Sequence, residues 1–524
     1  MSLPLIKSNS RLAACRKIGA FAFAIAFVLL PIALRADANN PLRLASLFQD
    51  HMVLQRDMPV PIWGEAQPGE HITVTFHGQS RSTQTNARGK WQVRLSPLAG
   101  TDQPAELRIQ AESDDSVVVI QNVVVGEVWI CSGQSNMQMA ATVTPELKAL
   151  YESSTGVHSF TVRRTVAFTE QDYCEGEWIE GPPNSAVALT FAHHLRQKID
   201  VPVGIVLSSW GSSSLEAWMP GDMTAELPYL KTIVGEFAAD AEKQQQIKTA
   251  LAKGKWSREE DILMRRQSIL PYNAMMHPLI PYAARGLVWY QGERNSRFIS
   301  GMPDEPAYMR VAGIQEYDEA LIAWMRRYRR AWSQDRFHFL AVMLPGYGRL
   351  LDTSPVDDHQ HPSAHSWAWM RESQLVALAL PDVAVANTID LGDENDIHPK
   401  DKQPIGERLA LLAVRDTLGQ KIVAQGPVMK RVKANQGELI VHFDHAMGLR
   451  TKDGEAPQAF WIADNSENWA QAEARIVGET VVLTSATVAK PRHVRYAWAG
   501  KPEVNLVNGA GLPAYPFRTD NFAP

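Results

Sequence analysis

Four residues of types that can carry out acyl transfer follow separate strand-like segments in the middle of this sequence. They are Ser135, Gly211, Asn295 and His398, and the first lies 263 positions before the last. The carboxyl ends of parallel strands meet at one edge of a sheet, and ligands bind at that edge. We therefore expect these four residues to come together in the folded protein.

Each of the four residue types suits a different part of an ester-cleaving reaction. A serine hydroxyl becomes an effective nucleophile when an imidazole accepts its proton, and His398 can do so near neutral pH. The negative oxygen that forms on the ester needs hydrogen-bond donors, which we assign to the Ser135 and Gly211 N–H groups and the Asn295 amide. Glycine suits position 211 because, without a Cβ, its backbone N–H can come close to the substrate. A lone serine after a strand is commonly only a helix N-cap, so the prediction depends on the convergence of all four.

The elements that must position these residues alternate between strand-like and helix-like segments. The strand-like runs are 123–130, 203–208, 286–290, 337–343 and 383–388, and the helix-like runs are 186–198, 318–332, 369–379 and 405–418. This alternation predicts an α/β domain with a five-stranded parallel sheet that is covered on both faces. A polar helical stretch at about 221–270 is interpreted as an insertion.

Both flanks of this domain have the composition of antiparallel β structure. Short alternating runs such as 71–76 and 91–95 are separated by Gly-containing turn segments, and runs such as 438–443 repeat the pattern near the end. We therefore expect an N-terminal β domain at 39–121, the central domain at 122–425, and a C-terminal β domain at 426–524, both flanks being β-sandwich-like.

The first 38 residues have the features of a secretory signal peptide. Four basic residues precede an uncharged run over 18–34, and Ala36-Asp37-Ala38 has the small-x-small form of a cleavage site. Uncleaved, the run would be a marginal membrane anchor. Removing residues 1–38 takes away five basic and one acidic side chain, which changes the formal net charge from −5 to −9. Such an acidic chain is a poor nucleic-acid binder, and no membrane contact is expected after cleavage.

Four motifs, in order along the chain, resemble those of the sialate O-acetylesterase family of SGNH hydrolases. They are Ser132-Gly133-Gln134-Ser135-Asn136-Met137, Trp210-Gly211, Trp289-Tyr290-Gln291-Gly292-Glu293-Arg294-Asn295 and Asp396-Ile397-His398-Pro399. The resemblance implies a flavodoxin-like central sheet and the removal of acetyl groups from sugar hydroxyls without a metal or organic cofactor. The four letters of the class name fall on Ser135, Gly211, Asn295 and His398.

This sequence departs from the family pattern next to the histidine. Many SGNH enzymes have an aspartate three residues before the histidine, where this chain has Asn395. Asp396, Asp393 or a backbone carbonyl could orient the imidazole instead, and Asp396 is the first choice.

Other side chains near the motifs are candidates for substrate binding. They are Gln134, Gln291, Glu293, Arg294 and Trp210. Asp357, Asp358, His359, His361 and His365 have no sharp ligand spacing, so a polar loop explains them better than a metal site. Cys131 and Cys174 could form a disulfide, but buried thiols are favoured because Cys131 continues an apolar strand.

Together these features predict a secreted or periplasmic serine esterase that acts on an O-acetylated sugar. Three alternatives stay open at this point. The substrate could be an acetylated plant polysaccharide fragment, such as one from xylan or xyloglucan, rather than a sialic acid. The protein could be a lipase or thioesterase, or a non-catalytic carbohydrate-binding protein whose β flanks bind sugar.

Overall fold

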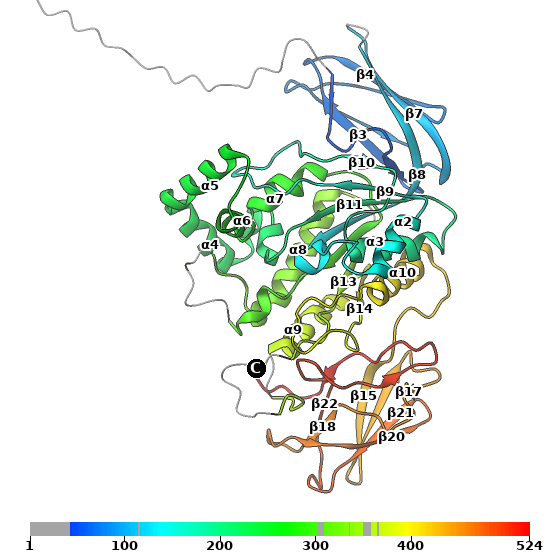
Figure 1. Ribbon diagram of the computed structural model, residues 1–524, viewed down its shortest axis with the longest axis vertical. Coiled ribbons are helices and arrows are strands. Elements are labelled where there is room, and N and C mark those ends of the chain that lie inside the picture. The colour runs from blue at the N-terminus through cyan, green and yellow to red at the C-terminus, as the bar shows by residue number, and fades with distance from the viewer. Residues whose placement is uncertain are drawn as a thin grey trace, which may run out of the picture. The chain divides into compact units, whose positions relative to one another are not determined.

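The computed structural model describes residues 42–113, 116–300, 306, 309–334, 336–348, 358–363 and 366–523 (Figure 1). The described residues from Leu42 onward belong to one compact unit. The expected signal peptide at 1–38 lies outside the described residues. Within the described ranges, no helix has the length and apolar character needed to cross a membrane.

Within these ranges, the central sheet has six parallel strands and one antiparallel edge strand. The order across the sheet is β10 (Trp178–Ile179), β9 (Val157–Thr161), β11 (Val203–Ser209), β8 (Val117–Gly133), β12 (Gly286–Tyr290), β13 (His338–Val342) and β14 (Val383–Ala386). β10 pairs antiparallel with β9, and the other neighbours pair parallel. Every residue of β11, β12 and β13 is buried, as expected for parallel strands covered on both faces.

The expectation of five parallel strands is wrong by one, because β9 adds a sixth. This strand contains His158 and Ser159, so it lacks the continuous apolar run that marks its neighbours. Both side chains are nevertheless buried, and each finds a backbone carbonyl partner. His158 Nδ1 lies 2.8 Å from the His51 oxygen, and Ser159 Oγ donates to Gly181 at 2.9 Å. Because these buried polar side chains have hydrogen-bond partners, β9 can be buried without the apolar pattern by which a buried strand is recognised in a sequence.

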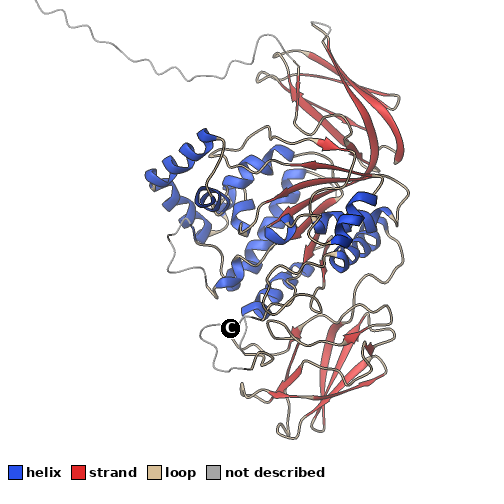
Figure 2. Cartoon of the chain, in the orientation of Figure 1, coloured by secondary structure: helices blue, strands red, loops and turns tan. Residues whose placement is uncertain are grey.

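Helices flank the central strands on both sides (Figure 2). Those near the expected ranges are α3 (Ala186–Arg196), α8 (Ile314–Trp332), α9 (Ser366–Leu375) and α10 (Gln403–Leu418). The others in the central part are α1 (Ser135–Gln138), α2 (Pro145–Ser153) and α7 (Leu270–Met275), with α4 (Pro228–Ala239), α5 (Ala241–Lys253) and α6 (Arg258–Arg265) in the insertion. A Cβ at Gly406 would lie 2.2 Å from Thr190 Oγ1, so glycine lets α10 approach α3 closely.

The N-terminal strands form mainly antiparallel layers that share β8 with the central sheet, and β2 pairs parallel with β8. One layer contains β1 (Arg43–Leu44), β3 (Val60–Glu65) and β6 (Lys90–Leu95), and the strands β2 (Val53–Gln55), β4 (His71–Phe76), β5 (Gln79–Gln84) and β7 (Thr101–Ala111) extend from β8. Strand β8 pairs with β7 in its first half and with β11 and β12 in its second. The expected boundary between residues 121 and 122 therefore falls inside a continuous strand.

The C-terminal strands form a separate hydrophobic core. Their sheets are β15 (Val428–Asn435), β16 (Glu438–Asp444), β21 (Thr480–Thr484) and β20 (Glu473–Val477), then β19 (Ala470–Gln471), β18 (Phe460–Ala463), β22 (His493–Tyr496) and β24 (Phe517–Arg518), and the pair β17 (Arg450–Thr451) and β23 (Leu506–Val507). This core extends to Met343 and Ile389, which follow β13 and β14. The C-terminal strands therefore pack against the segments that leave the carboxyl edge of the central sheet.

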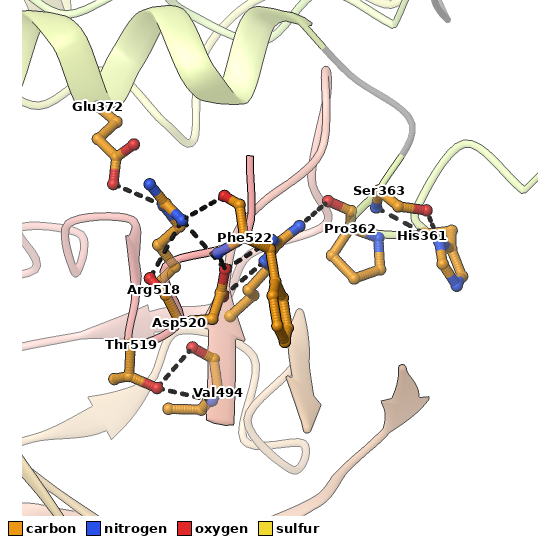
Figure 3. A network of polar contacts seen from close by, with 10 residues as sticks. His361, Pro362, Ser363, Glu372, Val494, Arg518, Thr519, Asp520 and Phe522 are labelled. Carbon is orange, nitrogen blue, oxygen red and sulfur yellow. Dashed lines mark hydrogen bonds and ion pairs between the residues drawn. The ribbon is translucent and has the colours of Figure 1, made fainter. Parts of the chain in front are cut away.

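Charged side chains also tie the C-terminal strands to α9. Asp520, whose side chain is fully buried, accepts hydrogen bonds from Arg495 at 2.7 and 2.8 Å and from Arg518 at 3.0 Å. Arg518 also donates to Glu372 of α9 at 2.8 Å (Figure 3). The end of the chain thus helps to hold the helix that precedes β14.

Candidate active site

Ser135 lies where β8 ends and the short helix α1 begins. The chain passes there through Gly133, whose φ of 141° lies in the region that favours glycine. A Cβ at Gly133 would lie 2.1 Å from the carbonyl oxygen of Tyr290 on β12. Glycine is therefore needed for the chain to turn this close to β12 and present Ser135 at the carboxyl edge of the sheet.

His398 reaches Ser135 from the segment that follows β14. Its Nε2 lies 2.9 Å from Ser135 Oγ, which is hydrogen-bond distance. Burial lowers the pKa of His398 below its ordinary value; the charge of Asp396 opposes this, whereas that of Lys402 adds to it. The neutral imidazole, which can accept a proton, therefore persists to lower pH than in a solvated histidine.

The carboxylates before His398 have different positions. Asp393 Oδ1 accepts the N–H groups of Asn395 at 2.7 Å and Asp396 at 3.0 Å, so it shapes the turn. Asp396 Oδ1 accepts the His398 N–H at 2.8 Å and lies 3.8 Å from His398 Nδ1. That second distance is too long for a hydrogen bond. Within the described part of the chain, no carbonyl accepts a hydrogen bond from Nδ1, so Asp396 is the nearest orienting charge.

A buried polar chain lies behind the Ser135–His398 pair. Asn136 donates from Nδ2 to Glu293 at 2.6 Å and to the Ile397 carbonyl at 3.1 Å, and it accepts from Lys402 Nζ at 2.6 Å. Burial raises the pKa of Glu293 to about 7 and lowers that of Lys402 to about 7. Asn136 therefore fixes the backbone beside His398 from the residue next to the serine, with Lys402 supporting it.

The three expected oxyanion donors differ in availability. In the described structure, the Ser135 N–H has no hydrogen-bond partner. Gly211 lies against Ser135, where an added Cβ would be 3.4 Å from the serine Cβ, but its N–H donates to Gln138 Oε1 at 2.5 Å. The assignment of Asn295 is wrong, because its amide donates to Glu216 at 3.3 and 3.4 Å and to the Ala312 carbonyl at 3.1 Å. Asn295 is fully buried and does not line the cavity at Ser135.

A cavity of about 1050 Å³ opens beside Ser135 and His398. Its lining includes Arg164, Arg265, Arg266, Arg294 and Arg297. Among the described lining residues, Glu293 is the acidic one, and it is 4% exposed. Tyr347 and Trp367 add aromatic surface. The cavity therefore combines positive charge with apolar rings beside the serine hydroxyl.

Three of the five expected substrate-binding residues line this cavity, namely Gln134, Glu293 and Arg294. Gln291 does not, because it is fully buried and donates to Asn295 Oδ1 at 2.7 Å and to Gln134 Oε1 at 3.2 Å. Trp210 does not either, because it is 1% exposed and its ring stacks on Trp256. Gln291 thus supports Gln134 of the cavity wall from behind, whereas Trp210 packs against Trp256, which is outside this lining.

Several cavity residues could not be found from the motifs. Gln138, Arg164, Arg265 and Arg266 line the cavity, and Lys402 lies behind it. The adjacent arginine pairs at 163–164 and 265–266 are visible in the sequence, but only the fold shows that they face the serine. Arg164 follows the unexpected strand β9, and Arg265 ends α6 of the insertion.

Within the described ranges, no group of three or more His, Cys, Asp or Glu side chains could hold a metal ion. Asp357 and His365 of the expected polar loop lie outside these ranges.

Cys131 and Cys174 are both free thiols, so the disulfide alternative is not realised. Burial raises the pKa of Cys174 to about 11 and that of Cys131 still further, which makes both poor nucleophiles.

Comparisons with known proteins agree with this site. Residues 125–415 match the family model for carbohydrate esterase, sialic acid-specific acetylesterase. The sialate O-acetylesterase of Rattus norvegicus is 28% identical, with 88% of this chain and 90% of that protein covered. The human sialate O-acetylesterase is 27% identical, with 94% and 95% covered. A carbohydrate acetylesterase from Xanthomonas citri has a crystal structure with a TM-score of 0.75 and 32% identity, covering 92% of this chain and all of that one.

The fold and the family match together define an esterase of the α/β class. The chain belongs to the carbohydrate esterase family of sialic acid-specific acetylesterases. This membership favours an enzyme over a non-catalytic carbohydrate-binding protein.

Proposed function

We propose that this protein is a serine esterase that removes O-acetyl groups from carbohydrate, with Ser135 as nucleophile and His398 as base. The observation that carries the proposal is the 2.9 Å contact between Ser135 Oγ and His398 Nε2 at the cavity wall. His398 accepts the hydroxyl proton as Oγ attacks the acetyl carbonyl, and it then returns the proton to the departing sugar hydroxyl. Water, activated by the same imidazole, releases acetate and restores Ser135.

The oxyanion is stabilised by the Ser135 N–H and by Gly211 N–H once the Gln138 side chain moves aside. Gln134 replaces Asn295 as the third donor in this proposal. The backbone N–H of Arg294 can only donate, so the Gln134 amide atom 3.1 Å from it is the oxygen. In the described structure the Gln134 Nε2 has no partner, and the residue lines the cavity. Each such donor contributes about 2.7–4 kcal/mol to transition-state stabilisation.

Acyl-chain length tests the esterase class. A series of p-nitrophenyl esters from acetate to octanoate separates an acetylesterase from a lipase or thioesterase. We expect kcat/KM to fall steeply beyond two or three carbons. A preference for the longest chains would contradict the acetylesterase proposal.

The charge of the cavity favours an acidic sugar as the substrate. Five arginines face it, and the buried Glu293 is the acidic lining residue among those described. A cleft of one sign concentrates substrates of the opposite sign, and guanidinium groups bind carboxylates well. An O-acetylated sialic acid carries such a carboxylate, whereas xyloglucan is neutral. We expect acetate release from O-acetylated sialic acids to exceed that from acetylated xylo-oligosaccharides and xyloglucan fragments. The reverse order would assign the enzyme to plant polysaccharides.

Asp396→Asn should move the acid limb of the pH profile to lower pH. The Asp396 charge raises the pKa of His398 against the dominant effect of burial, so removing it lowers that pKa further. The neutral base then persists at lower pH, and kcat/KM measured against pH falls later on acidification. Asp444→Asn, on the exposed side of the C-terminal strands, is the control. An acid limb that moves upward, or does not move, would show that Asp396 does not act on the imidazole.

The targeting and domain assignments complete the proposal. We assign residues 1–38 to a cleavable signal peptide, which makes the mature enzyme secreted or periplasmic. The catalytic part corresponds to 122–425, in a flavodoxin-like sheet widened by β9 and β10. The β structures at 39–121 and 426–524 flank it.

A further inference from the structure

A second cavity of about 330 Å³ adjoins the catalytic one, and Arg164 lines both. Its remaining lining includes Arg163, Trp256, Arg258 and Asp261. Most of these residues belong to the helical insertion or lie just before α6. The insertion therefore supplies most of the lining of a second concave site, which adjoins the catalytic cavity at Arg164.

Trp256 is held in a fixed position at this second cavity. Its ring stacks on Trp210 with 5.8 Å between centroids and 25° between planes. Trp210 is in turn anchored by a hydrogen bond from its Nε1 to Asp261 at 3.1 Å, and it directly precedes Gly211. The stacked pair therefore holds the Trp256 ring in place as an apolar part of the lining of the second cavity.

The lining of the second cavity has more basic than acidic side chains. Arg164 and Arg258 form no ion pair with any described residue, whereas Arg163 pairs with Glu175. Asp261 is already engaged by Arg265 at 3.0 Å and by Trp210. Arg258 interacts electrostatically with the exposed Glu259 but forms no ion pair with it, so the guanidinium groups of Arg164 and Arg258 can both bind an anion.

We propose that this second cavity is a subsite for a carboxylate-bearing sugar residue of the same oligosaccharide whose acetyl group is cleaved at Ser135. Guanidinium groups of Arg164 and Arg258 bind the carboxylate, and the Trp256 ring packs against the apolar face of the pyranose. The volume lies at the lower end of the range for small-molecule sites, which suits one sugar ring. The shared Arg164 places this ring next to the acetylated one. The inference rests on the proposed carbohydrate esterase function.

Binding experiments in a Ser135→Ala background test the subsite without turnover. The probes are 3′-sialyllactose and a glucuronic acid-bearing xylotriose, with neutral xylotetraose as the comparison, and titration calorimetry gives each Kd. We expect the acidic probes to bind and the neutral one to bind at least tenfold more weakly. Whichever acidic probe binds more tightly identifies the sugar acid. Equal binding of neutral and acidic probes, or no binding of either acidic probe, would overturn the proposal.

Variants locate the binding in the second cavity. Arg258→Ala and Trp256→Ala should each weaken the acidic probes by about tenfold, which corresponds to about 1.4 kcal/mol. Lys255→Ala removes the same charge from an adjacent exposed residue outside the cavity lining, and it should change Kd by less than twofold. Unchanged Kd values for Arg258→Ala and Trp256→Ala would refute the subsite. Hydrolysis of p-nitrophenyl acetate by the otherwise unaltered enzyme tests the esterase proposal separately.

Discussion

Ser135→Ala is expected to lower kcat for p-nitrophenyl acetate by about 10⁶-fold, because the nucleophile and its base act as one unit. The residual rate should come from substrate binding and the remaining oxyanion donors. Folding should be unaffected, since Ser135 supplies a cavity-facing hydroxyl rather than core packing. Steady-state kinetics and the thermal unfolding midpoint are the two measurements.

A second serine near the site provides the matched control. Ser132 lies on β8, is fully buried, and has no hydrogen-bond partner for its Oγ in the described structure. Removing an unpaired hydroxyl is nearly neutral, so Ser132→Ala should retain activity. Activity retained in Ser135→Ala, or lost only in Ser132→Ala, would show that the nucleophile is misassigned.

Asp520→Ala should lower the free energy of unfolding by about 3–5 kcal/mol, which is the largest stability effect we expect. The substitution leaves Arg495, whose side chain is 3% exposed, without its carboxylate partner. It also removes one of the contacts that hold Arg518, the residue joined to Glu372 of α9 (Figure 3). Urea denaturation followed by tryptophan fluorescence measures the change.

An exposed ion pair in the same C-terminal strands is the control for Asp520. Arg475 and Glu438 are 3.2 Å apart with side chains 60% and 31% exposed, so Glu438→Ala should cost no more than about 1 kcal/mol. Equal losses of unfolding free energy for the two substitutions would show that the buried ion pair contributes no more to stability than the exposed one.

Burial alone would raise the pKa of Asp520, but Arg495 and Arg518 together hold it below its usual value. The stabilisation is therefore present at neutral pH and is lost as pH falls through that lowered pKa.

The part of the site that could be predicted consists of residues that follow the carboxyl ends of the parallel strands. Continuous apolar runs mark β8, β11, β12, β13 and β14, and parallel strands present their carboxyl ends at one edge. Ser135 and His398 both follow such strands, and the structure brings their reactive atoms to 2.9 Å. Hydrophobic patterning therefore indicated the shared edge of the sheet, and the residue types after the strands indicated which side chains to expect there.

The parts that could not be predicted depend on contacts that periodicity does not encode. The strand β9 was missed because His158 and Ser159 interrupt its apolar pattern, although backbone carbonyls satisfy both. Asn295 was assigned because it follows a strand-like segment and its amide can donate, but that amide donates to Glu216, from a distant segment, in the interior. The arginines of the cavity come from the segment after β9, from the end of α6 and from the segment after β12, so their convergence requires the complete fold.

Covalent labelling tests the central claim that His398 activates Ser135 for attack on an ester. The intact enzyme is treated with a serine-directed fluorophosphonate, and the modified peptide is identified by mass spectrometry. We predict a single adduct on Ser135, formed rapidly in the unaltered enzyme and at a greatly reduced rate in His398→Ala. An adduct on another residue, or equally rapid labelling without His398, would contradict the account.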